Sequence, residues 1–426
     1  MAEINKNKTN SAYYLYVTGI LDNPILKSQV LNWIEVLQER GIVFDILSCP
    51  SIPYLLRHGK RQRAIIREFG GRLKVRIHQA VTLRSLDRFD PISPLIKALR
   101  VLRVIQNKRR EYKIDRVVLQ SRSGINHRTF ALLKKISGKT RIVFDFRGAA
   151  AEEYLNSLGY DSIAAVTDEK TVSRYHRRVS HDVEMMRIAD LVYCVSGALK
   201  SYLLDLPGAG TMTGKISVVP GAADENTFFH DPGLGEKLRR SLGLEGKKIA
   251  VYTGRLKNKY HKKELVFEFA ARFIAADPAN HFICLTPDME IANELKVQNG
   301  IADGNIMIAF TDDPAEINAF LNAAELGIIL RDDVMTNRVS SPTKLAEYLL
   351  AGLPVLASDH IGDYSDFIRR HNLGFIVANE IDRLVAAAGR CRFSAEERSK
   401  NSAIARTRFS KQANVEMIKA ALAGLH

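Results

Sequence analysis

The chain has 426 residues, of which 46% are hydrophobic and 26% are charged, and its formal net charge at pH 7 is +15. This length exceeds one typical hydrophobic core and predicts two domains of about 200 residues each. No apolar run reaches the roughly 18 residues of a membrane span, and the N-terminus lacks a secretory signal, so we expect a cytoplasmic protein.

The four cysteines, Cys49, Cys194, Cys284 and Cys391, are far apart and include no Cys-x-x-Cys pair. Cys194 and Cys284 lie inside apolar runs that are typical of buried strands. We therefore expect buried, reduced thiols in preference to disulfides or a zinc site.

Short apolar runs alternate with amphipathic segments along the whole chain. The first half predicts strands at 12–19, 44–49, 115–121, 141–146, 190–196 and 216–221, and helices at 25–41, 127–137 and 182–189. The second half predicts strands at 248–256, 281–288, 326–333 and 353–359, and helices at 263–277, 313–324 and from 341. This alternation indicates parallel sheets that are covered by helices on both faces.

Two doubly wound α/β domains in tandem are the simplest organisation that fits this order. The polar stretch 226–246 marks the seam, so we expect an N-terminal domain over 1–228 and a C-terminal domain over 229–405. The amphipathic segment 406–426 is expected to form a helix that could pack on either domain, including a return to the N-terminal one. Ligands of such sheets bind beyond the carboxyl ends of the strands, which predicts a cleft between the two domains.

Positive charge is concentrated in the segment 57–116. It holds 18 Lys and Arg against 5 Asp and Glu, an excess of 13 in a chain whose total excess is 15. One interpretation is a solvated face, because Leu95, Leu99, Leu102 and Ile105 follow helical spacing with the cations opposite. The alternative is a surface for anionic lipid head groups, to which each cation contributes about 1 kcal/mol. No known nucleic-acid module is recognisable, so we expect no nucleic-acid partner.

The segment 340–360 joins a helix start to a buried strand. The Ser341 hydroxyl is placed to cap the helix, and Pro342 suits its first position. Lys344 and Glu347 follow within the first turn and a half, where free backbone N–H groups and the helix dipole favour an anion. This arrangement predicts a phosphorylated ligand.

The second half resembles the retaining family 4 glycosyltransferases of the GT-B fold. The resemblance rests on the ordered blocks ISVVPGAADENTFF, VYTGRL, NIMIAFTDDPAEINAFLNAAELGIIL and PTKLAEYLLAGLPVLAS, and it extends more loosely through 22–41, 143–154 and 188–199. It implies two Rossmann-like domains facing a central cleft, with the acceptor bound by the N-terminal domain. The donor, a nucleoside diphosphate sugar, would be bound by the C-terminal domain.

The resemblance also assigns cations to the donor pyrophosphate, where negative charge grows as the sugar leaves. In the Gly-Arg-Leu block, Gly254 and Arg255 match the family pattern. The family lysine that follows has three candidates, Lys259, Lys262 and Lys263, of which we favour Lys262 because the helix after it is best defined. No Asp-x-Asp triplet occurs, so we expect metal-independent chemistry without a cofactor.

The start of the helix near 341 would complete the nucleotide site. The resemblance implies that the Thr343 and Lys344 amides hold the pyrophosphate and that Glu347 accepts hydrogen bonds from the ribose hydroxyls. Without that resemblance, Lys344 and Glu347 would be interpreted as a solvated ion pair. Gly19, after the first strand, resembles the family's first glycine loop and is expected to let a ligand approach the backbone.

One position departs from the family pattern. Family members often carry a glutamate eight residues before the one matched by Glu347, and this chain has Val339 there. Because that glutamate usually contacts the donor sugar, its role is missing or belongs to neighbours. The candidates are Asn337, Arg338 and Ser340.

On the acceptor side, the family often places a histidine at the end of a first-domain strand. Here Arg147 stands near that position, with Asp145 two residues earlier. Both could bind acceptor or donor sugar, or they could form a buried ion pair at the strand end. Glu152 in the following helix and His127 are further candidates, although His127 also fits a hydrogen-bonded histidine at a helix start.

Together these features predict a glycosyltransferase, and the family resemblance implies retention at the anomeric carbon. Its acceptor is expected to be a glycan, and a lipid-linked or cell-envelope polysaccharide intermediate if the basic segment contacts a membrane. Two alternatives stay open: a non-hydrolysing sugar-nucleotide epimerase of the same fold, and a nucleotide-sugar-binding protein without catalysis.

Overall fold

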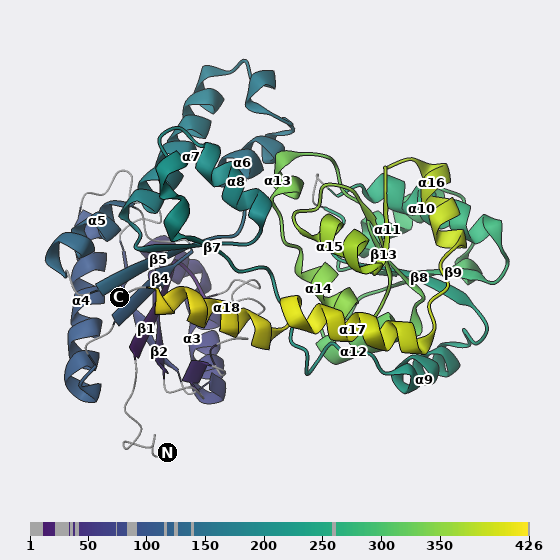
Figure 1. Cartoon of the computed structure of the whole chain (residues 1–426), viewed down its shortest axis with the longest axis horizontal. Coiled ribbons are helices and arrows are strands. Elements are labelled where there is room, and N and C mark those ends of the chain that lie inside the picture. The colour runs from purple at the N-terminus through teal and green to yellow at the C-terminus, as the bar shows by residue number, and fades with distance from the viewer. Residues whose placement is uncertain are drawn as a thin grey trace.

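The computed structural model describes residues 12–21, 34, 37–38, 42–73, 75–82, 92–114, 117–122, 127–137, 140–257 and 261–424. Two parallel sheets stand side by side, each covered by helices on both faces (Figure 1). This confirms the prediction of two Rossmann-like doubly wound domains. The helix predicted at 25–41 lies largely outside the described residues.

The N-terminal sheet has the strand order β3-β2-β1-β4-β5-β6-β7 among the described residues. Its strands are β1 (Ala12–Thr18), β2 (Ile42–Ser48), β3 (Arg76–Gln79), β4 (Val117–Ser121), β5 (Thr140–Phe146), β6 (Leu191–Cys194) and β7 (Ile216–Val218). The connecting helices are α3 (Ile52–Leu73), α4 (Ile92–Tyr112), α5 (His127–Ile136), α6 (Ala150–Leu158), α7 (Glu169–Ile188) and α8 (Gly197–Asp205).

The C-terminal sheet has the order β10-β9-β8-β11-β12-β13. Its strands are β8 (Lys248–Thr253), β9 (Asn280–Leu285), β10 (Ile306–Ala309), β11 (Leu326–Ile329), β12 (Val355–Ser358) and β13 (Gly374–Val377). Its helices are α9 (Pro232–Leu242), α10 (Lys263–Ala276), α11 (Met289–Gln298), α12 (Pro314–Ala323), α13 (Met335–Arg338), α14 (Thr343–Leu350), α15 (Tyr364–His371), α16 (Ile381–Gly389) and α17 (Ala395–Phe409).

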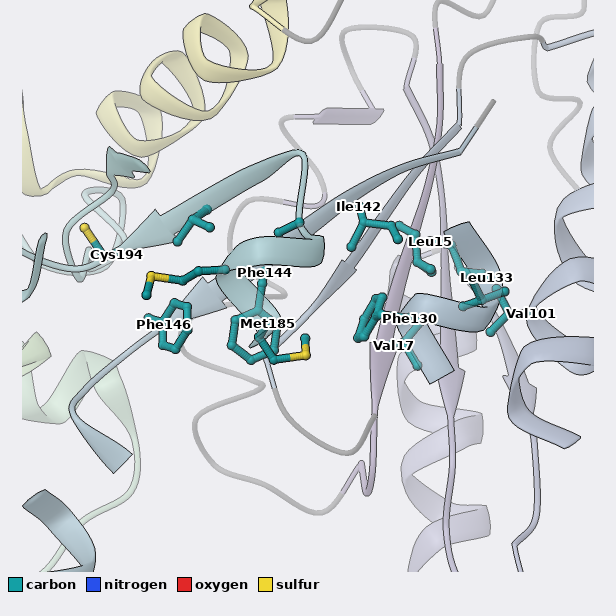
Figure 2. Packing of buried hydrophobic residues seen from close by; sticks show 14 of the residues in the cluster. Leu15, Val17, Val101, Phe130, Leu133, Ile142, Phe144, Phe146, Met185 and Cys194 are labelled. Carbon is teal, nitrogen blue, oxygen red and sulfur yellow. The ribbon is translucent and has the colours of Figure 1, made fainter. Parts of the chain in front are cut away.

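Each face of the N-terminal sheet has its own hydrophobic cluster. On one face, Phe130 and Leu133 of α5 pack with Val101 of α4 and with Leu15 and Val17 of β1, as Figure 2 shows. The other face holds residues of α3 and also of α18 (Lys411–Ala423), the helix that ends the described chain. The branched and aromatic residues of the strands alternate between these two clusters, which explains why the apolar runs are almost continuous.

The helix α18 belongs in space to the N-terminal domain. After α17 runs along the C-terminal domain, the chain crosses over, and α18 buries Val415, Ile418 and Leu422 in the cluster that also holds Tyr14 and Phe44 (Figure 1). The predicted boundary at 228 falls between β7 and α9. The exact domain limits stay predictions.

Hydrogen bonds join the two domains near the carboxyl ends of β6 and β7. The Asp363 carboxylate accepts bonds from the Gly197 and Ala198 amides at 2.9 and 3.4 Å, so a residue of one domain caps helix α8 of the other. Thr336 donates to Asn156 across the same junction. These contacts place α13 and the start of α14 against the N-terminal domain.

The four cysteines are buried and none forms a disulfide, as the sequence predicted. Burial raises the pKa of the Cys194 and Cys284 thiols to about 12, so both stay protonated at neutral pH. Within the described ranges, no helix is both long enough and apolar enough to span a membrane.

The predicted apolar face of α4 is partly wrong. Leu95 and Leu99 are 45% and 55% exposed, whereas the buried face runs through Ala98, Val101 and Ile105. The helix is therefore rotated relative to the prediction. Its buried side also includes two lysines, Lys97 and Lys108, and the Lys108 ammonium pairs with buried Asp45 of β2 at 3.4 Å. That pairing makes a lysine acceptable on the face that simple periodicity assigns to leucine.

The rotation of α4 predicts unequal costs for two similar truncations. Ile105→Ala should lower the free energy of unfolding by about 2–5 kcal/mol, because it leaves a cavity in the core. Leu99→Ala should change it by less than about 0.5 kcal/mol, because that side chain is largely in solvent. Urea unfolding of both variants measures the difference, and equal costs would contradict the observed orientation of α4.

Candidate functional site

The start of α14 differs from the prediction in two respects, because Pro342 is not its first residue and Ser341 does not cap it. The helix begins at Thr343, Pro342 precedes it in an extended conformation, and no side chain caps it. The Ser341 hydroxyl instead accepts a 2.8 Å hydrogen bond from the Gly221 amide in the segment that leaves the N-terminal domain. A Cβ atom at Gly221 would lie 2.7 Å from the Ser341 carbonyl oxygen, so only glycine permits this approach. The first amides of α14 thus have no side-chain cap from their own segment.

Lys344 and Glu347 form an ion pair at the beginning of this helix. The Lys344 ammonium lies 2.9 Å from the Glu347 carboxylate, and the two side chains are 33% and 12% exposed. The first four amides of an α-helix lack partners within the helix and attract anions. A cation and a hydrogen-bond acceptor therefore flank an anion-attracting helix end.

Tyr348 ties α14 to the end of β8. Its hydroxyl accepts a 2.8 Å hydrogen bond from the Thr253 amide and donates a 3.0 Å bond to the Thr253 hydroxyl. The next residue, Gly254, has a φ of +142°, which strongly favours glycine, and it directs the chain to exposed Arg255. The Gly254–Arg255 turn and the start of α14 are thereby held at the same edge of the sheet.

The loop after Arg255 is anchored to its surroundings at several points. The Asp288 carboxylate accepts bonds from the Leu256 and Lys257 amides at 2.8 and 3.1 Å. The His261 ring donates through Nδ1 to the Arg255 carbonyl at 3.0 Å, and burial lowers the pKa of this imidazole to about 4. His261 is therefore neutral at physiological pH.

This anchoring places one of the three candidate lysines at the end of β11. The Lys262 amide bonds to the Leu330 carbonyl at 3.3 Å, and its ammonium pairs with the Asp332 carboxylate at 2.7 Å. The Lys263 ammonium instead contacts Glu264 on α10, 3.7 Å away. Lys259 lies outside the described residues. Of the two candidate lysines that the structure describes, Lys262 is thus the one held beside the end of β11.

The structure explains the valine that departs from the family pattern. Val339 is 1% exposed and packs in the same cluster as Phe146 and Ala149 of the N-terminal domain. Its carbonyl also accepts a 2.8 Å bond from the Ser196 hydroxyl. A glutamate at this position would bury a carboxylate in the apolar contact between the domains, so valine suits the junction.

The neighbours proposed to replace that glutamate are already engaged. Arg338 forms a two-pronged pair with Asp333 at 2.7 and 2.9 Å, and the Ser340 hydroxyl donates to the Asn337 carbonyl at 2.8 Å. Buried Asn337 accepts a bond from Arg331 at 3.1 Å. These contacts stiffen the segment that precedes α14.

Across the junction, Asp145 and Arg147 meet at the end of β5, with a third residue that the sequence analysis missed. The Arg147 Nε atom lies 2.9 Å from Asp145 Oδ1, and the Arg122 guanidinium reaches Asp145 Oδ2 at 2.9 Å from the end of β4. Burial opposes ionisation of Asp145, but the two guanidiniums hold its pKa below the usual value. Arg122 follows the strand-like run VVLQS, and this position at a strand end was the available signal.

Three candidates remain, Glu152, His127 and Gly19, and their contacts are with residues other than Asp145 and its two arginines. Glu152 accepts hydrogen bonds from Tyr175 and Tyr202 at 2.7 and 3.2 Å, which indicates a role in packing the helices. His127 stacks edge-on against His181 with 5.5 Å between ring centres. Gly19 follows β1, and its carbonyl accepts a 3.4 Å bond from Ser48.

A cavity of about 670 Å³ lies elsewhere, at the amino ends of β8 and β11. Lys248 and Glu325 line it, together with Arg239, Cys391 and Arg398. It is at the sheet edge opposite to Arg255 and α14, so it does not belong to the candidate site.

No protein-family model and no curated protein sequence matches the chain. Solved structures do match along nearly its whole length. HepE of Anabaena in complex with UDP has a TM-score of 0.66 at 16% identity, covering 97% of this chain and 100% of that one. A glycosyltransferase from Rickettsia africae has a TM-score of 0.69 at 15% identity, covering 98% and 99%. The lipopolysaccharide outer core galactosyltransferase WaaB reaches 0.63 at 14% identity, covering 97% and 99%. The chain therefore has the GT-B fold, as the resemblance implied.

Proposed function

We propose that the chain is a glycosyltransferase that moves a sugar from a nucleoside diphosphate sugar to an acceptor hydroxyl, with retention at the anomeric carbon. One observation carries this proposal: the hydrogen bonds of Tyr348 to Thr253 hold the Gly254–Arg255 turn beside the start of α14. The solved structures of similar fold support it, because HepE was crystallised with UDP and with UDP-glucose. Retention and the kind of acceptor follow from the family resemblance.

Each residue of this edge has a chemical task in the proposal. The uncapped amides of Thr343 and Lys344 would hold the pyrophosphate, and Glu347 would accept bonds from the ribose hydroxyls. Arg255 and Lys262 would stabilise the negative charge that grows on the leaving diphosphate. Lys262 would exchange its pairing with Asp332 for the phosphate as the donor binds. These cations would take the place of a metal ion.

The donor site predicts a stability response to nucleotides. UDP at about 100 times its dissociation constant should add roughly 2.7 kcal/mol and raise the melting temperature by roughly 5–10 °C. Glu347→Ala should weaken UDP binding by roughly 10- to 100-fold, because it removes charge-assisted hydrogen bonds. Arg255→Ala should lower kcat by about 100- to 1,000-fold. A thermal-shift screen of UDP, GDP, CMP and ADP, followed by assays of sugar transfer, measures these effects.

Glu268→Ala serves as the matched control, because Glu268 is exposed on α10 and away from α14. It should bind nucleotides as the unmodified protein does. Nucleotide binding that persists in Glu347→Ala would remove the role proposed for that residue. Conversion of the sugar nucleotide without any acceptor would favour the epimerase alternative. Binding without turnover would favour the non-catalytic one.

We also propose that the N-terminal domain contacts an anionic membrane, where a lipid-linked acceptor would be presented. Exposed apolar residues occupy the first turns of α3 and the early turns of α4: Leu56 is 82% exposed, Leu95 45% and Leu99 55%. Helix α3 begins shortly after the carboxyl end of β2, and Arg100 of α4 donates to the Gln79 carbonyl at the carboxyl end of neighbouring β3 at 3.2 Å, so these side chains lie near one edge of the sheet. Cations follow on exposed positions of α3, which is the pattern of an interfacial helix.

The membrane proposal predicts lipid binding that depends on both charge and apolar residues. The protein should sediment with anionic vesicles of phosphatidylglycerol at low salt and much less with neutral vesicles of phosphatidylcholine. The double variant Leu56→Ser/Leu99→Ser should lose most of this binding. Val297→Ser, which changes a 77% exposed valine on the C-terminal domain, should retain it. Equal sedimentation with both kinds of vesicle would argue against the proposed surface.

A further inference from the structure

The cluster at the ends of β4 and β5 holds two arginines around one aspartate. Arg122 and Arg147 both pair with the single carboxylate of Asp145. The Arg122 side chain is 12% exposed, that of Arg147 is 16% exposed, and that of Asp145 is 1% exposed. Among the described residues, Arg147 therefore pairs with a carboxylate that it shares with a second guanidinium, in a mostly buried place.

The hydrogen bonds to Asp145 converge on one of its two carboxylate oxygens. Its Oδ2 atom accepts from Arg122 Nε at 3.1 Å and Nη2 at 2.9 Å, from Arg147 Nε at 3.0 Å and from Gln120 Nε2 at 3.3 Å. Arg147 reaches Asp145 only through Nε. Within the described part of the chain, its two terminal amino groups donate no hydrogen bond.

The cluster lies at the sheet edge that carries the junction between the domains. Arg122 and Arg147 follow the carboxyl ends of β4 and β5, and Ser196, which follows neighbouring β6, bonds to the Val339 carbonyl of the other domain. Burial raises the pKa of the buried Tyr16 hydroxyl, and the charges of both guanidiniums oppose that rise. In such a weakly polar environment, uncompensated charge is unfavourable, and an added anion would relieve it.

We propose that Arg147, oriented by Asp145 and supported by Arg122, binds a carboxylate or phosphate group carried by a sugar substrate. The planar fork of a guanidinium matches both anions, and the terminal amino groups of Arg147 are the donors left for them. The substrate class is therefore an acidic sugar. This inference rests on the proposed function, and the anionic group could belong either to the transferred sugar or to the acceptor.

Binding measurements distinguish these two sources. In the donor arm, UDP-glucuronate is compared with UDP-glucose, and in the acceptor arm, glucuronate and glucose 6-phosphate are compared with glucose at saturating UDP. One arm should show at least a tenfold preference for the anionic ligand. Arg147→Gln should reduce that preference to twofold or less and leave UDP affinity unchanged. Arg103→Gln, which changes an exposed cation on α4, should retain it.

Thermal stability gives a test that needs no sugar. Arg147→Gln should leave the melting temperature unchanged or raise it, because Asp145 keeps Arg122 as a partner and a mostly buried cation is removed. The double variant Arg122→Gln/Arg147→Gln should lower it, because buried Asp145 then loses both cations. If Arg147→Gln alone is as destabilising as the double variant, Arg147 is a structural partner of Asp145 and the inference fails.

The inference also fails if the unmodified protein prefers anionic ligands in neither arm, or if Arg147→Gln keeps the preference. If the unmodified protein does not bind UDP at all, that result contradicts the proposed glycosyltransferase function itself. The UDP titration therefore separates the failure of one proposal from the failure of the other.

Discussion

The hydroxyl of Tyr348 makes the bonds on which the candidate donor site depends. It is fully buried, accepts from the Thr253 amide and donates to the Thr253 hydroxyl, so it joins the donor-site helix to the strand that carries Arg255. Burial raises the pKa of this hydroxyl, which keeps its proton available for donation. Its ring also packs where Gly327 has no side chain, since a Cβ atom there would lie 2.4 Å from the ring. The position of Glu347 relative to Arg255 follows from these contacts.

The junction between the domains explains the departure at Val339. Because this residue packs into the N-terminal core while its carbonyl accepts a hydrogen bond from Ser196, the segment that precedes the candidate donor site also connects the two domains. Asp363 strengthens the same junction by capping α8. A carboxylate lost at position 339 is thus compatible with an intact site, provided that other groups contact the sugar. For these contacts we propose the terminal amino groups of Arg147, acting on an acidic sugar.

Much of the fold could be predicted because it depends on local patterns. Apolar runs identified the strands, and the blocks from 216 to 358 indicated the GT-B fold despite low sequence identity to the solved structures. The orientation of α4 could not be predicted, because Asp45 of strand β2 pairs with Lys108 and so makes a lysine acceptable on the buried face of the helix. Arg122 was missed for a similar reason, since its importance depends on Asp145 in the next strand.

The sequence by itself determined the two doubly wound domains and the chemical character of the start of α14. Helical and strand periodicity, glycine and proline positions and charged residues near a helix start act over a few neighbouring residues, so they can be interpreted without coordinates. Only the tertiary structure decided that Ser341 binds Gly221 instead of capping its helix, that Val339 packs into the other domain and that two arginines share Asp145. Each of these contacts joins residues distant in the chain, and their energy depends on burial and on partners that local patterns do not contain.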